Sequence, residues 1–149
     1  MLTVGLTDDL ATCHALRRVV FIDEQNVDAA LEVDGRDAQA LHILARLGPD
    51  PVGCARLLID GETAKIVRVC VLREHRGAGV GRALMRATVA VAMAQPGLRR
   101  AKLGSQVHAL KFYAALGFVA VGPEYMEAGI AHRDMALDLF PRDGAGASC

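Results

Sequence analysis

A run of alternating glycines near the middle of the chain has the composition of an anion-binding loop. The run, Arg76-Gly77-Ala78-Gly79-Val80-Gly81, lies between a segment patterned as a strand and a segment patterned as a helix. Glycines let successive backbone N–H groups turn toward one point, and the N-terminus of a following helix adds unpaired N–H groups and positive charge. Arg76 and Arg82 flank the run and can pair with phosphate oxygens. We therefore predict a phosphate or pyrophosphate site formed by Arg76, Gly77, Ala78, Gly79, Val80, Gly81 and Arg82.

The glycine run can be compared with three known kinds of phosphate-binding loop. A P-loop ends in Gly-Lys-Ser/Thr, whereas the end here is Val80-Gly81-Arg82. A dinucleotide-binding fingerprint needs Gly-x-Gly-x-x-Gly, whereas the three glycines here are evenly spaced. The pyrophosphate loop of CoA-dependent acyltransferases, R/Q-x-x-G-x-G/A, has the spacing of Arg76, Gly79 and Gly81. The spacing favours CoA as the ligand, and a glycine-rich turn without a ligand is the alternative.

The elements that must hold this loop follow from hydrophobic patterning and turn residues. Expected strands cover residues 2–6, 39–47, 52–59, 63–72, 101–106, 118–121 and 131–140, with Gly122-Pro123 as a linker between the last two. Expected helices cover residues 80–94, 109–116 and a first helix up to 20 capped by Thr7, with a short second helix within 21–36. A meander followed by a crossover helix predicts an α+β fold with a mixed sheet, parallel across the crossover.

Composition limits the class of protein. The 149 residues are 52% hydrophobic and carry 17 basic and 17 acidic residues, which argues against a broad surface for nucleic acid or anionic membrane. Neither a signal peptide nor a membrane span is expected, and the four cysteines have no CxxC spacing. Histidines lack metal-ligand spacing, so no metal is predicted. We expect one cytoplasmic domain, residues 1–140, with a disordered tail, residues 141–149.

Two blocks of sequence resemble the GNAT superfamily of N-acetyltransferases. The stretch 69–85, which contains the glycine run, resembles the central motif of that family. Downstream, Gln106-Val107-His108-Ala109-Leu110-Lys111-Phe112-Tyr113 and then Leu116-Gly117-Phe118 resemble N-x-x-A-x-x-x-Y followed by L-G-F. Four further segments are similar to the ElaA-like subgroup: residues 21–27, Asp34-x-x-Asp37 with His42, residues 105–109 and residues 127–132. The resemblance covers residues 2–140.

The resemblance implies a fold, a donor and several site residues. The fold would be a mixed, splayed sheet of about seven strands flanked by about four helices, with the pantetheine of acetyl-CoA inserted between the strands on either side of the helix after the loop. The backbone of Val69, Cys70 and Val71 would bind the pantetheine, and Gln106 stands where the family has a cofactor-contacting Asn. Tyr113 corresponds to the tyrosine that protonates the departing thiolate. The implied reaction is direct attack of an amine on acetyl-CoA in a ternary complex.

The general base and the acceptor are less constrained by the sequence. An acceptor amine must lose a proton before it attacks, and the strand before the loop offers no carboxylate. His132, five residues after Glu127, could line an acceptor cleft, whereas His42 in an apolar strand is more typical of a core histidine. Further candidate bases are Glu32, Asp34 and Asp37. We expect a small-molecule or peptide amine as acceptor and a possible homodimer, and the alternative function is a catalytically silent CoA-binding module.

Overall fold

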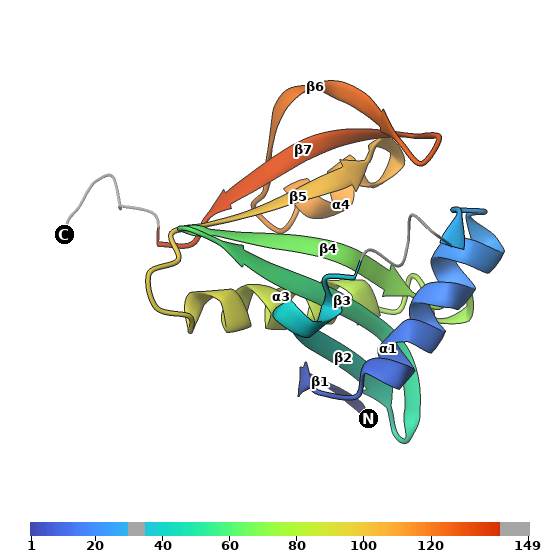
Figure 1. The fold of residues 1–149 in the computed structure, drawn as a ribbon. Helices are drawn as coiled ribbons and strands as arrows, with labels where there is room; N and C mark the ends of the chain where they lie inside the picture. Colours follow the sequence, from blue (N-terminus) through green and yellow to red (C-terminus); the bar gives the residue numbers. More distant parts are fainter. Residues whose placement is uncertain (30–34, 141–149) are drawn as a thin grey trace.

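The strands of the computed structural model, which describes residues 1–29 and 35–140, form one mixed sheet (Figure 1). Their order is β1-β2-β3-β4-β5-β7-β6. The strands are β1 (Leu2–Thr7), β2 (Leu41–Leu47), β3 (Asp50–Asp60), β4 (Thr63–Val71), β5 (Arg100–Gln106), β6 (Val119–Glu127) and β7 (Ile130–Asp138). Strands β1 to β4 form an antiparallel meander, β4 and β5 are parallel, and β5, β7 and β6 are antiparallel. The predicted α+β fold with a mixed sheet of seven strands is confirmed.

The sheet splays between its two parallel strands. Pairing of β4 with β5 covers Thr63↔Arg100, Ala64↔Ala101 and Lys65↔Lys102. Beyond these three pairs, β4 continues beside β3 and β5 continues beside β7, so the two halves of the sheet diverge toward the ends of both strands (Figure 1). Within the described residues, the facing edges of β4 and β5 beyond this point pair with no other strand.

Helices cover the two faces of the sheet. They are α1 (Leu10–Arg17), which continues into the π-helical η1 (Arg18–Glu24), α3 (Val80–Met93) and α4 (Leu110–Ala114), with short 3-10 turns η2 (Asp37–Gln39), η3 (Arg73–His75) and η4 (Val107–Ala109). Helix α1 is capped by Asp9, which accepts from Thr12 N at 3.2 Å, and not by Thr7 as predicted. Thr7 Oγ1 instead accepts from Asp9 N at 3.1 Å, so the threonine supports the cap from one step earlier.

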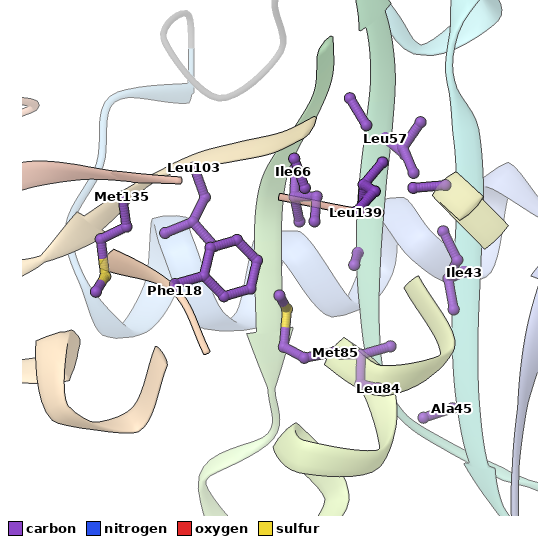
Figure 2. Packing of buried hydrophobic residues seen from close by; sticks show 14 of the residues in the cluster. Ile43, Ala45, Leu57, Ile66, Leu84, Met85, Leu103, Phe118, Met135 and Leu139 are labelled. Carbon is purple, nitrogen blue, oxygen red and sulfur yellow. The ribbon is translucent and has the colours of Figure 1, made fainter. Parts of the chain in front are cut away.

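Alternating strand residues feed two hydrophobic clusters on opposite faces of the sheet. The larger cluster packs beneath α3 and joins both halves of the sheet, because Leu103, Phe118 and Met135 from the second half belong to the same cluster as Ile66 and Leu84 (Figure 2). The smaller cluster lies beneath α1 and consists of Cys13, Leu16, Val20, Leu44, Cys54 and Cys70. The larger cluster therefore connects the halves that the splay separates.

Several boundaries differ from those predicted. Strand β6 runs through Gly122-Pro123, and a register shift between Val121 and Glu124 absorbs the proline, whose missing N–H is tolerated on an edge strand. The hairpin turn lies later, at Ala128 and Gly129, both with positive φ. The predicted helix 109–116 is divided into η4 and α4. The expected second helix and the tail 141–149 involve residues outside the described part. Within the described part, no helix is long and apolar enough to cross a membrane.

Candidate active site

The glycine loop delivers backbone N–H groups at the start of α3. Gly77 and Gly79 have φ of 82° and 86°, values that favour glycine, and a Cβ added to either would meet no atom within 4 Å. The N–H of Ala83 makes a helical hydrogen bond to the carbonyl oxygen of Gly79. The N–H groups of Val80, Gly81 and Arg82 precede that bond at the positive end of a 14-residue helix. This arrangement fits a phosphate group.

Gly81 has a different role from its two neighbours in the motif. A Cβ at Gly81 would lie 3.3 Å from Phe112 Cζ and 3.8 Å from Val71 Cγ2. The missing side chain lets the first turn of α3 approach α4 and the end of β4. The spacing of the motif did not distinguish this packing glycine from the glycines of the loop.

Arg76 is held at the loop by a residue that the sequence analysis did not select. Its guanidinium makes a bidentate ion pair with Glu24 at the end of η1, with N–O distances of 2.6 and 2.8 Å, and its Nε donates to the carbonyl oxygen of Val71 at 2.9 Å. The hydrogen bond from Arg76 lowers the pKa of the Glu24 carboxyl. Arg76 thus fixes the end of β4, and binding a phosphate would require it to share its charge with Glu24.

Strand β4 carries a bulge where it has left β5. Cys54 pairs with Cys70 and Arg56 with Val67, so β4 has one extra residue in this interval, and Arg68 within it has φ of 55°. The predicted pantetheine-binding residues Val69, Cys70 and Val71 follow directly. Val69 and Val71 pack against the cluster beneath α3, whereas the Cys70 thiol is buried in the cluster beneath α1, 3.6 Å from Cys54 Sγ. Their backbone forms the splayed edge of β4.

Tyr113 lies on α4 and packs against the larger hydrophobic cluster. Its ring makes edge contacts with Phe112, at a centroid distance of 4.9 Å, and with Phe118, at 6.2 Å. Burial raises the pKa of Tyr113 to about 12. The phenol is therefore protonated at neutral pH, as a general acid must be.

Gln106 ends β5 and bridges toward η1. Its side-chain N–H donates to Gln25 Oε1 at 3.0 Å, and its Oε1 accepts from His108 Nε2 at 2.6 Å. Together with the ion pair of Glu24 and Arg76, this bond ties the end of η1 to both sides of the splay. Gln25 is a second residue that sequence reasoning missed.

His132 and Glu127 come together across the β6–β7 hairpin. His132 is 7% exposed, and its Nδ1 lies 2.7 Å from the carbonyl oxygen of Ile130. A carbonyl only accepts, so Nδ1 carries the proton and the lone pair of the neutral ring is on Nε2. Nε2 lies 3.9 Å from Glu127 Oε2. The strand register places His132 beside Gln106 on β5, at the splayed end of that strand.

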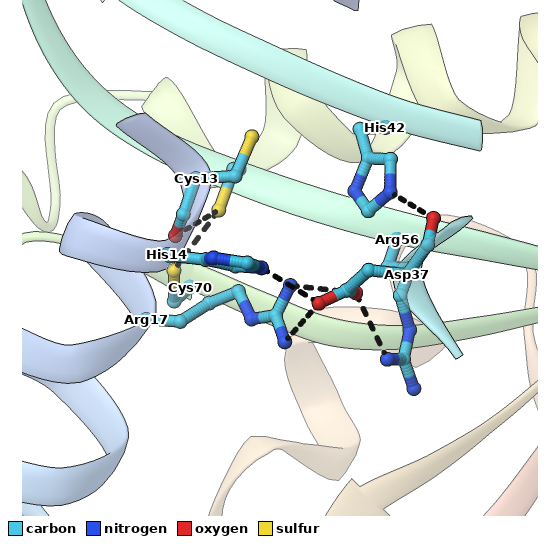
Figure 3. A network of polar contacts seen from close by, with 8 residues as sticks. Cys13, His14, Arg17, Asp37, His42, Arg56 and Cys70 are labelled. Carbon is cyan, nitrogen blue, oxygen red and sulfur yellow. Dashed lines mark hydrogen bonds and ion pairs between the residues drawn. The ribbon is translucent and has the colours of Figure 1, made fainter. Parts of the chain in front are cut away.

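His42 and Asp37 belong to a separate polar cluster on the α1 face (Figure 3). His42 Nε2 donates to the backbone oxygen of Asp37 at 2.9 Å. The Asp37 carboxylate accepts from His14 at 2.7 Å, Arg17 at 2.9 Å and Arg56 at 3.1 Å. Burial opposes ionisation here, but the hydrogen bonds from Arg17, His14 and Arg56 prevail and hold the pKa of Asp37 well below its usual range. Both candidates have structural partners, and such a carboxylate is a poor base at neutral pH.

Two candidate bases and the question of a metal site remain. Glu32 and Asp34 lie outside the described residues. Among residues 1–29 and 35–140, no group of three or more His, Cys, Asp or Glu side chains could hold a metal ion. The structure thus brings together the glycine loop, the end of β4 and α4, the helix that carries Tyr113, and places His132 on β7, on the other side of β5 from β4.

Comparisons with known proteins agree with this geometry. Residues 11–139 match the family model of the acetyltransferase (GNAT) domain. The chain is similar to the uncharacterized N-acetyltransferase YjcF of Bacillus subtilis, at 36% identity over 88% of this chain and 94% of that protein. It is also similar to Escherichia coli ElaA, at 36% identity over 84% of each sequence, and the crystal structure of that protein superposes with a TM-score of 0.81 and 31% identity over 93% and 99% of the chains.

A more distant structure shares the fold. A GNAT family acetyltransferase from Elizabethkingia anophelis, solved with acetyl-CoA bound, superposes with a TM-score of 0.72 at 16% identity, over 92% of this chain and 97% of that one. The splayed sheet described above is thus common to proteins of widely different sequence.

Proposed function

The chain belongs to the GNAT family of acetyltransferases, and from that premise we propose that it moves an acetyl group from acetyl-CoA to an amine by direct attack in a ternary complex. The observation that carries the proposal is the coincidence of two features at one place. The unpaired N–H groups at the start of α3 lie at the end of the same strand, β4, whose edge is exposed by the splay. The first feature suits a pyrophosphate, and the second suits an extended amide chain that adds to a strand edge.

Acetyl-CoA is proposed to bind along the splayed edge of β4 and the start of α3. The loop from Gly77 to Arg82 would bind the pyrophosphate, and the backbone of residues 69–71 would bind the pantetheine. In support, the glycines leave open space in front of the loop, and a structural neighbour is solved with acetyl-CoA bound.

The chemical step needs a base for the amine and an acid for the thiolate. The neutral amine attacks the thioester carbonyl carbon, the C–S bond breaks, and Tyr113 donates its phenolic proton to the departing sulfur. Burial raises the pKa of Tyr113 to about 12, and the same apolar surroundings disfavour a free thiolate, so the two groups remain matched for proton transfer.

His132 is the proposed base. Its Nδ1–H is fixed on the oxygen of Ile130, which leaves Nε2 to accept a proton, and Nε2 lies 3.9 Å from the Glu127 carboxylate. The acceptor is proposed to be a small-molecule or peptide amine. A cytoplasmic location is part of the proposal, and the buried free thiols Cys13, Cys54 and Cys70 support it.

Two measurements test the proposal together. Calorimetry gives the Kd of acetyl-CoA, and a thiol reagent follows CoA release with a polyamine, an amino sugar and a lysine-containing peptide as acceptors. We expect binding, and thiol release with at least one amine. Gly79→Glu should abolish binding, because a carboxylate would occupy the place of a phosphate, whereas Gly48→Glu, at another open positive-φ glycine far along the chain, should not. Binding without any turnover would identify a silent CoA-binding module, and no binding would contradict the site.

A further inference from the structure

Four residues on three adjacent strands form one connected group beside the splay. Strand register places His132 opposite Gln106 and Tyr125, and Asp134 opposite Gly104. The side chain of Tyr125 contacts those of both His132 and Asp134 across β6 and β7, and its hydroxyl reaches as far as Gly104 on β5. Apart from His132, these residues have no part in the chemistry described above.

The ring of Tyr125 stacks on the imidazole of His132. The two ring centroids are 5.9 Å apart and the planes differ by 20°, an offset parallel arrangement. His132 is 7% exposed, and its Nδ1 is bound to the oxygen of Ile130. The stack restrains the face of the imidazole, and the hydrogen bond restrains one edge. Together the two contacts restrain the direction in which Nε2 points.

The ring of Tyr125 is itself anchored at its far end. Its hydroxyl donates to Asp134 Oδ1 at 2.6 Å, and Asp134 Oδ2 lies 3.6 Å from Lys102 Nζ. Burial and the hydrogen bond to Asp134 raise the pKa of Tyr125, so it remains a donor at neutral pH. A charge-assisted hydrogen bond of this length fixes the orientation of the phenol.

Gly104 leaves the space that this anchor needs. A Cβ at Gly104 would lie 2.5 Å from the Tyr125 hydroxyl oxygen, a distance that real Cβ atoms do not show. The backbone of Gly104 lies in a regular strand and not among the positive-φ glycines, so its conformation does not require glycine. The hydroxyl of Tyr125 is therefore the reason that a side chain does not fit here.

We propose that Tyr125 is a positioning residue that holds the His132 imidazole in its catalytic orientation, with Asp134 as its anchor and Gly104 as the gap that admits it. The inference rests on the proposed role of His132 as base. A hairpin that needed only packing would not require a tyrosine hydroxyl that binds Asp134 and lies directly against a glycine of a third strand. Instead, Gly104 on β5 and Asp134 on β7 fix the position of the Tyr125 ring, and this ring fixes the imidazole.

A double-mutant cycle between Gly104 and Tyr125 tests the geometry. Gly104→Ala should displace the Tyr125 ring and lower kcat about 10-fold, as should Tyr125→Phe, while the KM for acetyl-CoA stays unchanged. In the double variant the hydroxyl is gone and the next atoms, Asp134 Oδ1 and Tyr125 Cζ, lie at 3.6 and 3.8 Å, so Gly104→Ala should add no further loss. Gly5→Ala, in another strand with open space around it, is the matched control. Equal losses from Gly104→Ala in both backgrounds would overturn the proposal.

A second cycle asks whether Tyr125 acts through His132. Tyr125→Phe should lower kcat in the wild-type background and have no effect in a His132→Ala background. A 10-fold loss that persists without His132 would show that Tyr125 acts by another route and would overturn the inference. Should His132→Ala itself leave kcat unchanged while wild type turns over, the base assignment fails and the inference fails with it.

A spectroscopic readout does not depend on knowing the acceptor. Long-range ¹H–¹⁵N NMR spectra report the tautomer of each of the five histidine rings, and His132→Ala assigns the relevant one. Wild type should show the Nδ1–H form alone for His132, and Tyr125→Phe should show a mixture of tautomers with an otherwise native spectrum. A single unchanged tautomer in Tyr125→Phe would contradict the positioning role, whereas failure of wild type to bind acetyl-CoA would contradict only the proposed function.

Discussion

The two halves of the sheet differ in how deeply their strands are buried and in what their buried polar residues contact. In the meander of β1 to β4, seven consecutive residues of β3, Val52 to Leu58, are buried, and helices cover both faces. In the half formed by β5, β7 and β6, the edge strand is largely exposed, and alternate residues of β5 are exposed. Burial alone does not separate structural from functional residues in such a molecule. For a buried histidine, the better criterion is which groups lie within reach of the second ring nitrogen.

The two buried histidines show this contrast most directly. His42 is 5% exposed and His132 is 7% exposed, so solvent access does not distinguish them. His42 lies in the meander and donates Nε2 to the backbone of Asp37, within a cluster of charged partners. His132 donates Nδ1 to its own hairpin, and its Nε2 lies near a carboxylate that is 65% exposed. The first histidine donates to the backbone of η2, whereas the second donates to its own hairpin and has its Nε2 beside an exposed carboxylate.

The largest effect should come from breaking the charged cluster of the meander. Asp37→Asn removes the carboxylate shared by Arg17 and Arg56, both almost fully buried, and should lower the free energy of unfolding by about 3 kcal/mol. Since the folded pKa of Asp37 is depressed, its contribution is present above the unfolded pKa of about 4 and is lost as pH falls below it. Urea denaturation at pH 7 and pH 3 should therefore show a smaller difference between variant and wild type at the lower pH. A difference independent of pH would contradict this assignment.

Tyr113→Phe should act on the rate and leave stability almost unchanged. The ring contacts with Phe112 and Phe118 persist, and only the proton donor is lost. We expect kcat to fall about 10²-fold, with the KM for acetyl-CoA unchanged, because the interaction strengthens as the thiolate forms. Steady-state kinetics and a melting curve measure both quantities. Wild-type turnover with chemistry rate-limiting would make Tyr113 a packing residue.

The histidine pair sharpens the comparison between the halves. His132→Ala should lower kcat by about 10-fold to 10²-fold, whereas His42→Ala should leave kcat unchanged; both should lower stability by about 1 kcal/mol, because each removes a buried, hydrogen-bonded imidazole. Each variant serves as the control for the other, because both remove a buried imidazole. An exchange of the two phenotypes would reverse the roles assigned to the two halves.

The smallest effect should come from the ion pair at the mouth of the splay. Glu24→Gln keeps a hydrogen-bond partner for Arg76 but removes the charge that holds it. Arg76 would then no longer share its charge between Glu24 and a phosphate, so the Kd for acetyl-CoA should fall, and only about threefold because both side chains are partly exposed. Calorimetry at two salt concentrations measures the change, and Glu74→Gln in the adjacent η3 turn is the control. A rise above tenfold would indicate that Glu24 contacts the donor itself.

Local signals made part of this molecule predictable. The glycine run and Pro96-Gly97 bound α3 so closely that the predicted span, 80–94, differs from Val80–Met93 by one residue. Strand β6 was misjudged because Gly122-Pro123 is typical of a linker, and only its place at the sheet edge makes the proline tolerable. The pairs of Glu24 with Arg76 and Gln25 with Gln106 span 52 and 81 residues, and no local pattern encodes a contact at such a separation.

The divergence of β4 from β5 also changes how the sheet meets its surroundings. In the described residues, the sheet has two outer edges, β1 and β6, and two inner edges where β4 and β5 separate. Backbone groups at an unpaired edge exchange hydrogen with solvent more readily and can pair with foreign strands. A donor bound along the inner edge of β4 would protect it as an additional strand does. By mass action, a donor present at 100 times its Kd adds about 2.7 kcal/mol to the stability of the fold, so the abundance of acetyl-CoA would also set how long the protein survives unfolding and proteolysis.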